Sequence, residues 1–323
     1  MRRIGVLTSG GDGPGLNPCV RAVTRTALGY ELEVIGIKRG YAGLVDCEMI
    51  QLDARAVGGI IGQGGTFLGT DRAPEFKTVQ GQREALRNLN RQSIEGLVVI
   101  GGNGSLTGAL ALHKHGFPVV GVPATIDNDV PGTDIAIGVD TTLNTILGAI
   151  DRIKDTASSH QRAFLIEVMG RDCGYLALMG GVAGGAEMVL IPEVETTLEE
   201  VAQGLLDAYI RGKAHCIIVV AEGYKLGCQA IVDYLRERRE ELGFEVRLTV
   251  LGHIQRGGSP TAYDRLLATR LGAAAVTELH NGRYGQMVGT RGREIVTTPL
   301  EEVANGRIEL DLDLYNLAKE MEK

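Results

Sequence analysis

The stretch FPVVGVPATIDND, residues 117–129, decides how the rest of this chain is interpreted. Its first half, residues 117–122, is an apolar run typical of a buried strand. Its last residues place Asp127 and Asp129 two positions apart, directly after that strand. In such a pair, one carboxylate can accept a proton from a substrate hydroxyl while the other helps to hold a metal ion. The same residues could instead form an Asp-Asn-Asp turn with only local hydrogen bonds, and the sequence leaves that alternative open.

Short apolar runs alternate with segments of helical periodicity along the whole chain. Predicted strands cover residues 3–8, 32–37, 94–100, 117–122, 163–169, 187–191, 214–220 and 246–251, and predicted helices cover residues 17–28, 105–115, 141–156, 197–211, 229–242 and 263–280. This alternation predicts an α/β fold of doubly wound, mainly parallel sheets with helices on both faces. The length of 323 residues suggests about two domains. The loop at residues 130–138 is the best candidate for a boundary between them.

Two glycine-rich turns follow predicted strands and open predicted helices. They are TSGGDGPG, residues 8–15, and GGNGS, residues 101–105. Backbone N–H groups in such turns, together with a helix N-terminus, form a site for anions such as phosphate. Neither turn matches the P-loop pattern or the dinucleotide fingerprint. Plain glycine turns remain the alternative, although two of them beside an acidic pair favour a polyphosphate held between neighbouring strands.

Basic side chains gather in three later segments, residues 159–162, 169–171 and 252–258. We expect all three to be polar ends of buried strands, where an Arg fork can bind a second phosphate. A surface ion pair is the commoner role for any single Arg. Together with the acidic pair and the glycine turns, these segments suggest phosphoryl transfer from a nucleotide to a phosphorylated small molecule.

The composition excludes several other classes of protein. The net charge of −7 and the absence of Trp argue against binding of nucleic acid or of a membrane surface. Five cysteines without a C-x-x-C pair fit a reducing cytoplasm. The chain begins directly with a predicted strand and has no apolar run of about 18 residues, so we expect neither a signal peptide nor a membrane span. The histidine and cysteine spacings do not indicate a transition-metal site.

Eight segments carry a resemblance to a known family. They are IGVLTSGGDGPGLN (4–17), GGTFLGT (64–70), VVIGGNGS (98–105), TIDNDV (125–130), SSHQR (158–162), EVMGRDCG (167–174), IPEVE (191–195) and VLGHIQRGGSP (250–260). In this order and spacing the chain resembles the bacterial ATP-dependent 6-phosphofructokinase family over essentially its whole length. The resemblance implies a homotetramer in the cytoplasm with active sites shared between subunits. It also implies a nucleotide-binding domain of residues 1–138 plus 256–306 and a sugar-phosphate-binding domain of residues 139–255 plus 307–323.

The resemblance implies phosphorylation of fructose 6-phosphate at O1 in glycolysis, with ATP and Mg²⁺. Asp127 would be the base, Asp129 would lie near the metal, Thr125 would lie beside the transferred phosphoryl group, and Arg171 would stabilise its charge. The expected ATP-binding residues are Gly11, Tyr41, Arg72, Asn103, Gly104, Ser105 and Gly108, and the expected metal-binding residues are Asn103 and Asp129. The expected sugar-phosphate residues are Met169, Gly170, Glu222, His253 and Arg256, joined by Arg162 and Arg247 of a neighbouring subunit.

The chain also departs from the family pattern. Asn103 replaces an Asp that helps to position Mg²⁺, and it could instead only shape its turn. Gly104 and Ala124 stand where pyrophosphate-dependent relatives have Asp and Lys, which favours ATP as the donor. The residues expected to bind an effector such as ADP or phosphoenolpyruvate are Arg21, Arg25, Lys154, Gly185, Glu187, Arg211, Lys213 and His215. Ala54, Gly58 and Gly59 lack the family's charged side chains, so we expect weak allosteric control.

Two rival interpretations remain at this point. The first is a kinase of the same fold that uses another phosphoryl donor or another sugar phosphate. The second is a weakly active or inactive regulatory relative, which only Asn103 supports. A screen of donors separates the first from the ATP-dependent enzyme, and measurable turnover removes the second.

Overall fold

The computed structural model describes residues 1–321, and the chain divides into two compact units. Unit 1 consists of Met1–Thr141 and Arg256–Ile308, and unit 2 consists of Thr142–Gln255 and the chain from Glu309 onward. The loop at residues 130–138 lies within unit 1. The division follows it in the first turn of helix α5 (Val139–His160). None of the helices in the described chain has the length and apolar character that a membrane span requires.

Within the described residues, unit 1 is built on a seven-stranded sheet of order β11-β10-β5-β4-β1-β2-β3. The strands are β1 (Arg3–Ser9), β2 (Glu33–Ile37), β3 (Met49–Leu52), β4 (Gly96–Gly101), β5 (Val119–Pro123), β10 (Gln286–Arg291) and β11 (Glu294–Pro299). The central strands pair in parallel, while β3 and β11 pair antiparallel at the two edges. The residues of β4 and β5 are all buried, as continuous apolar runs in the centre of a parallel sheet require.

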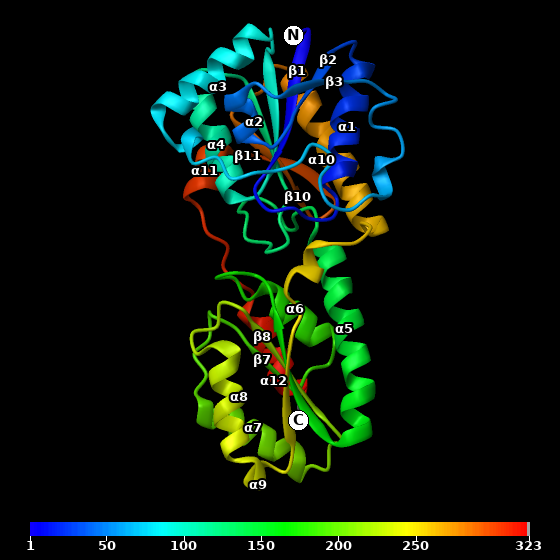
Figure 1. Ribbon diagram of the computed structural model, residues 1–323, viewed down its shortest axis with the longest axis vertical. Helices are drawn as coiled ribbons and strands as arrows, with labels where there is room; N and C mark the ends of the chain where they lie inside the picture. Colours follow the sequence, from blue (N-terminus) through cyan, green and yellow to red (C-terminus); the bar gives the residue numbers. More distant parts are fainter. Residues whose placement is uncertain (322–323) are drawn as a thin grey trace. The chain divides into compact units, whose positions relative to one another are not determined.

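Helices cover both faces of the unit 1 sheet (Figure 1). They are α1 (Leu16–Gly29), α2 (Tyr41–Asp46), α3 (Val79–Arg91), α4 (Asn103–Lys114), α10 (Ala262–His280) and α11 (Leu300–Asn305), with short 3-10 turns η1 (Ile60–Gly62) and η2 (Glu75–Lys77). One hydrophobic core joins α1 and α10 to the sheet, and a second joins α2, α3, α4 and α11 to it. Burial on both faces holds the carboxyl ends of β1, β4 and β5 in a fixed relation.

Unit 2 has a four-stranded sheet of order β7-β8-β6-β9 within the described residues, with every pair parallel. The strands are β6 (Arg162–Val168), β7 (Met188–Leu190), β8 (Cys216–Ala221) and β9 (Glu245–Val250), and the further helices are α6 (Tyr175–Ala183), α7 (Leu198–Ile210), α8 (Gly227–Glu237), α9 (Arg239–Leu242), α12 (Leu312–Met321) and the 3-10 turn η3 (Gly252–Arg256). A core of apolar residues joins α7 and α8 to one face of this sheet. Figure 1 shows α6 and α12 on its other face.

The α/β class with mainly parallel sheets is confirmed, but two predicted helices differ in extent and several elements were not predicted. The predicted helix 141–156 is longer, because α5 continues to His160 and ends directly before β6. The predicted helix 229–242 is divided at Arg238 into α8 and α9. The elements α2, β3, α3, α6, β10, β11, α11 and α12 were not predicted.

Candidate functional site

The acidic pair lies in a tight turn directly after β5. Asp127 is buried, with 3% of its surface exposed, and its backbone N–H donates to Thr125 Oγ1 at 3.2 Å. Asn128, between the two aspartates, has φ of 52°. Its side chain accepts from Ala136 N at 2.9 Å and donates to the Asp134 carbonyl at 3.1 Å. Asn128 therefore supplies local hydrogen bonds of the kind expected for an Asp-Asn-Asp turn, and this turn carries the two carboxylates on either side of it.

Asn103 and Asp129 meet at the carboxyl ends of the neighbouring strands β4 and β5. The Asn103 amide Nδ2 donates to the backbone oxygen of Asp129 and to its Oδ2, both at 2.9 Å. The other two side-chain oxygens, Asn103 Oδ1 and Asp129 Oδ1, are buried and have no hydrogen-bond partner within the described residues. Oxygen atoms of this kind suit a hard divalent cation. Residues 1–321 contain no group of three His, Cys, Asp or Glu that could hold a metal by themselves, so a bound cation would take further ligands from water or from a substrate.

Both predicted glycine turns occur at the same edge of the unit 1 sheet. The first leads from β1 into α1, and the second leads from β4 into α4. Arg256 donates to the Asp12 carbonyl at 3.2 Å. A Cβ added at Gly11 would lie 2.6 Å from Arg256 Nη1, so the guanidinium lies against the first turn. A Cβ added at Gly104 would meet nothing within 4 Å, so open space adjoins the second turn.

The remaining expected nucleotide residues differ in exposure. Tyr41 is buried, its hydroxyl donates to the Ser105 carbonyl at 2.7 Å, and its ring stacks on Phe76. Burial raises the pKa of Tyr41 well above its ordinary value, so the phenol stays neutral. A Cβ added at Gly108 would meet this ring at 2.7 Å. Tyr41 thus holds the first turn of α4 through its hydrogen bond to Ser105. Arg72, in contrast, lies exposed in the loop that precedes η2.

Four expected sugar-phosphate and catalytic residues gather at the carboxyl ends of β6 and β8 in unit 2. Met169 and Gly170 follow β6, and the Arg171 N–H donates to Glu222 Oε1 at 2.8 Å. Arg171 has φ of 51°. A Cβ added at Gly223 would lie only 1.9 Å from the Arg171 carbonyl oxygen, so only glycine fits where these two turns cross. His253 is exposed in η3.

Sequence reasoning missed two buried residues that hold these turns. Gln255 has no exposed surface, and its Oε1 accepts from the Met169 N–H at 3.1 Å. In unit 1, Asp264 accepts from the N–H groups of Gly138 and Thr141 at 2.9 and 2.8 Å. Burial raises the pKa of Asp264, and the hydrogen bonds from Thr141 and Gly138 oppose that rise. For both residues, the sequence signal was a polar side chain in an otherwise apolar or turn segment. When such a side chain is buried, it is expected to form hydrogen bonds.

Residues 159–162 were expected to form the polar end of a strand, but Ser159 and His160 belong to helix α5, and Arg162 begins the strand. Arg162 is the first residue of β6, because α5 runs on to His160, and Arg247 lies within β9. The Glu245 carboxylate accepts a hydrogen bond from Arg162 Nε at 2.8 Å and also forms an ion pair with Arg247. The hydrogen bond from Arg162 is the main cause that lowers the pKa of Glu245. These arginines therefore lie away from Met169 and Gly170 in the same unit.

Most of the expected effector residues gather near the amino ends of β7 and β8. Glu187 is 8% exposed, accepts from the Ile217 N–H at 2.6 Å and pairs with Lys213 at 3.1 Å. His215 Nδ1 lies 2.8 Å from Ser158 Oγ. Lys154 donates to the carbonyl of Gly184, next to Gly185. Arg21 and Arg25 belong to α1 in unit 1, so this chain alone distributes the set over both units.

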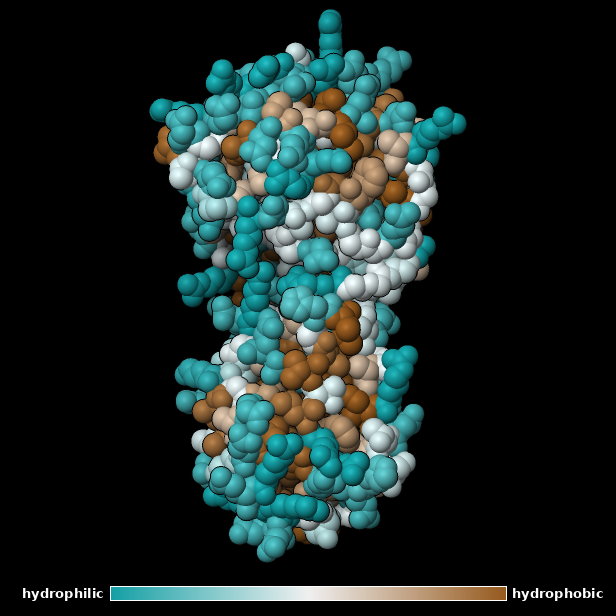
Figure 2. All heavy atoms as spheres, in the orientation of Figure 1, coloured by the Kyte–Doolittle hydropathy of each residue, from teal (hydrophilic) through white to brown (hydrophobic). Residues whose placement is uncertain are grey.

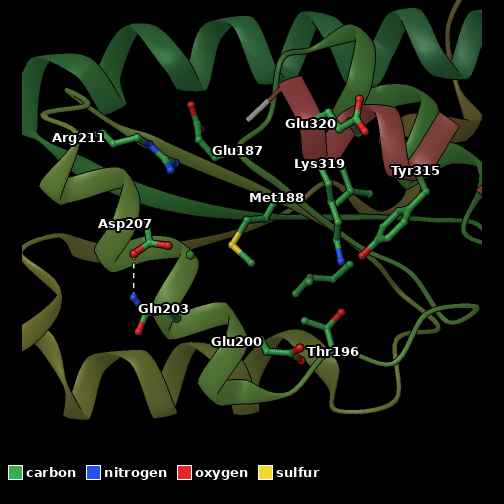
Figure 3. A pocket seen from close by; sticks show the side chains of 14 residues that line it. Glu187, Met188, Thr196, Glu200, Gln203, Asp207, Arg211, Tyr315, Lys319 and Glu320 are labelled. Carbon is green, nitrogen blue, oxygen red and sulfur yellow. Dashed lines mark hydrogen bonds between the residues drawn. The ribbon is translucent and has the colours of Figure 1, made fainter. Parts of the chain in front are cut away.

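A cavity of about 470 Å³ lies between α7, β7 and α12 in unit 2 (Figure 3). Its charged lining residues are Glu187, Glu200, Asp207, Arg211, Lys319 and Glu320. Carboxylates outnumber cations in this lining, so the cavity is poorly suited to a phosphate. Of the residues expected to bind an effector, Arg211 and Glu187 line this cavity.

Comparisons with known proteins agree with this geometry. A family model described as Phosphofructokinase matches residues 3–279. The ATP-dependent 6-phosphofructokinases of Halalkalibacterium halodurans and Bacillus subtilis are each 52% identical over 321 residues, which is 99% of this chain and 99% of each relative. The solved phosphofructokinase of Saccharomyces cerevisiae is 35% identical with a TM-score of 0.87, and this chain spans 47% of that longer chain. A pyrophosphate-dependent phosphofructokinase of Marinobacter aquaeolei shares the fold at 23% identity and a TM-score of 0.86.

Proposed function

This chain belongs to the phosphofructokinase family, and on that premise we propose that it transfers the terminal phosphoryl group of ATP to O1 of fructose 6-phosphate in glycolysis. The observation that carries the proposal is the buried acidic turn beside two glycine turns, in a chain that matches curated ATP-dependent 6-phosphofructokinases over 99% of both lengths. The relatives' names supply the substrates, and the geometry supplies the groups that the chemistry needs.

Asp127 is the proposed base. Its carboxylate takes the proton from the O1 hydroxyl as the new bond from O1 to phosphorus forms and the bond from phosphorus to the leaving oxygen of ADP breaks. Thr125 lies in the same turn, where its hydroxyl can contact the transferred group. Arg171 supplies positive charge that offsets the charge developing on the phosphoryl oxygens. Such a reaction depends on positioning and electrostatics more than on covalent chemistry.

A divalent metal fits the residues of unit 1, and we propose Mg²⁺. Asp129 Oδ1 and Asn103 Oδ1 are the buried oxygens that would hold it, directly or through water. When bound with ATP, Mg²⁺ would neutralise phosphate charge. Gly11, Gly104 and Ser105 would place backbone and hydroxyl groups against the nucleotide phosphates, and Arg72 would add charge. Tyr41 and Gly108 would contribute indirectly, by fixing the first turns of α4.

Met169, Gly170, Glu222 and His253 would bind the sugar phosphate, together with Arg256. Arg162 and Arg247 pose a separate problem, because Arg162 begins the strand that ends at Val168. Six residues at about 3.3 Å each separate these ends by about 20 Å, more than an arginine side chain can span. Arg162 therefore fits a role in the site of a neighbouring subunit, and we propose the same role for Arg247, which pairs with the same Glu245. This supports an oligomer with shared active sites, for which we propose a homotetramer.

The surface also supports association of subunits. Figure 2 shows apolar side chains grouped on the viewed face of unit 2. Large side chains left exposed on the described chain include Ile210 at 71%, Leu266 at 66% and Ile254 at 61%. The grouped apolar surface of unit 2, more than these individual side chains, favours burial against another protein surface, here a second copy of the chain. In a tetramer, Arg21 and Arg25 of one subunit could complete the effector set that the other residues begin, with ADP or phosphoenolpyruvate as the proposed effector. We place the enzyme in the cytoplasm, where ATP is supplied and where the thiols of Cys19, Cys47 and Cys228 stay reduced.

The donor is argued from two small residues. The open space beside Gly104 leaves room for a nucleotide. An Asp side chain at this position would fill part of that space and add a negative charge. Ala124 is buried and offers no cation for pyrophosphate. The test is a coupled assay with fructose 6-phosphate and Mg²⁺ in which ATP, GTP and pyrophosphate are compared at equal concentration. We expect ATP to give the highest kcat/KM, and faster turnover with pyrophosphate would overturn the proposal.

A further inference from the structure

We infer that Asn103 is a positioning residue whose amide group fixes the Asp129 carboxylate, so that this corner of the site is already ordered without a cation. The inference rests on the proposed function, because Asp129 is there the carboxylate assigned to the metal. It goes beyond the two roles considered for Asn103 from sequence, a weak metal contact or a turn former, because it assigns a function to the NH₂ group of the amide. The structure adds an atom-level partner that neither role included.

The hydrogen bonds determine which atom of the amide faces Asp129. The partners at 2.9 Å are a backbone carbonyl oxygen and a carboxylate oxygen, and both can only accept. Only the NH₂ end of the amide satisfies both contacts, since an amide oxygen there would oppose two acceptors. Asp129 Oδ2 thus accepts a hydrogen bond from Asn103, and Asp129 Oδ1 does not take part in that contact.

The remaining atoms show what the arrangement presents. Asn103 Oδ1 and Asp129 Oδ1 are both buried and lack a hydrogen-bond partner within residues 1–321. They come from one amide and one carboxylate, so the pair carries a single negative charge. Such a pair attracts a bare divalent cation less than two carboxylates would, and it leaves most of the cation's affinity to the nucleotide phosphates.

An aspartate at position 103, the residue of the family pattern, would behave differently in this geometry. A carboxylate oxygen would replace the NH₂ group opposite Asp129 O and Oδ2, and three acceptors would face one another. Repulsion would then loosen the turn until a cation intervened. With Asn103 the site therefore binds the cation less tightly than it would with an aspartate, but the Asp129 carboxylate is ordered even when no cation is bound.

The test uses the intact purified protein and needs no turnover. Thermal unfolding is followed in EDTA and in Mg²⁺ for wild type, Asn103→Asp, and Asn103→Ala, with Asn90→Asp as a control that adds a charge at an exposed helical position. We expect Asn103→Asp to unfold about 2–6 °C lower than wild type in EDTA and to regain most of the difference in Mg²⁺. Asn103→Ala should be lowered in both conditions, because it loses the donor without adding charge, and Asn90→Asp should follow wild type.

A second readout is binding of Mn²⁺ alone, measured by the loss of the free-ion electron paramagnetic resonance signal. We expect Asn103→Asp to bind Mn²⁺ at least about 10-fold more tightly than wild type. The inference is overturned if Asn103→Asp matches wild type in EDTA, or if both bind Mn²⁺ equally. If Asn103→Asp does not fold, an unchanged Asn103→Ala melting temperature overturns it instead. These outcomes do not depend on turnover, so an inactive wild type would remove the proposed function without deciding this inference.

Discussion

The polar side chains at the carboxyl edge of the unit 1 sheet and those at the amino edge of the unit 2 sheet are organised in opposite ways. At the first edge, Asp129 and Asn103 are ordered by hydrogen bonds and still present buried oxygens without partners. At the second edge, Arg162 and Lys213 already pair with Glu245 and Glu187. The first edge therefore presents ordered oxygens that a ligand can contact. At the second edge, the named cations are neutralised by carboxylates of the same chain.

The direction of the strands explains much of this difference. Helices that follow strands begin at the carboxyl edge, where their N–H groups and dipoles favour anions. The amino edge receives helix C-termini, which favour cations and offer no N–H groups to a phosphate. A phosphate site at that edge must therefore be built from Arg and Lys side chains. In a single chain such side chains pair with nearby carboxylates until a neighbouring subunit or a ligand competes for them.

The largest expected effect is at the carboxyl edge. Asp127→Asn keeps the shape of the buried side chain and removes its basicity, so kcat should fall by roughly 10²–10⁴-fold with a smaller change in KM. Steady-state kinetics with ATP and fructose 6-phosphate measure this. The control is Asp151→Asn, the same change at an exposed position of α5, which should leave kcat unchanged. More than a tenth of wild-type kcat in Asp127→Asn would remove Asp127 as the base.

The next effect tests whether the amino edge serves another subunit. Arg162→Ala should raise KM for fructose 6-phosphate by about 10–150-fold, the equivalent of one charge-assisted contact of about 1.5–3 kcal/mol. Tetramers that mix Arg162→Ala subunits with His253→Ala subunits should contain some sites with both side chains intact. Those hybrids should recover part of the wild-type rate, and verified mixed tetramers without any recovery would contradict the shared site.

A smaller effect tests the rigidity of the carboxyl edge in unit 2. Gly223→Ala places a Cβ at 1.9 Å from the Arg171 carbonyl oxygen, so the two turns must move apart. The free energy of unfolding should fall by about 1–3 kcal/mol, as for other overpacked sites. Gly29→Ala is the matched control, because its added Cβ meets nothing within 4 Å, and it should stay within about 0.5 kcal/mol of wild type. Denaturant titration compares them, and equal stabilities would show that the crossing of the turns is not constrained.

The smallest effect is expected from the effector residues. Their cations can bind a phosphate, but coupling requires different affinities in two states of the protein. Ala54, Gly58 and Gly59 provide no charged groups to distinguish one effector from another. We expect ADP or phosphoenolpyruvate to shift the half-saturating fructose 6-phosphate concentration by less than about 5-fold. A shift of tens of fold would show that other residues couple this edge to catalysis.

The sequence predicted the central strands and the glycine and acidic turns well, because buried parallel strands are continuous apolar runs. It did not reveal α3, where Thr78 caps a helix made mostly of polar residues. The edge strand β11 was also missed, since it is largely exposed and lacks a clear apolar pattern, and its neighbour β10 was missed with it. Edge elements are stabilised by pairing with strands distant in sequence, which local periodicity does not report.

The candidate site shows the same limit. The positions of Asn103 and Asp129 after neighbouring strands could be predicted, but the direction of the hydrogen bond between them could not, because it depends on side-chain rotation. The extension of α5 to His160 was not predicted, so the residues expected to connect that helix to β6 turned out to be mostly helical. Gln255 was overlooked, because only tertiary packing shows that its side chain is buried and holds the Met169 backbone.

The central claim is phosphoryl transfer from ATP to O1 of fructose 6-phosphate, and ³¹P NMR of the reaction tests it most directly. Wild-type protein is incubated with ATP, Mg²⁺ and fructose 6-phosphate, and the phosphorus signals are followed over time. The account predicts that the γ-phosphate signal of ATP declines as ADP and a new phosphate monoester at C1 of the sugar appear in equal amounts, with the 6-phosphate retained. ATP hydrolysis to inorganic phosphate without the new monoester, or no consumption of ATP, would contradict it.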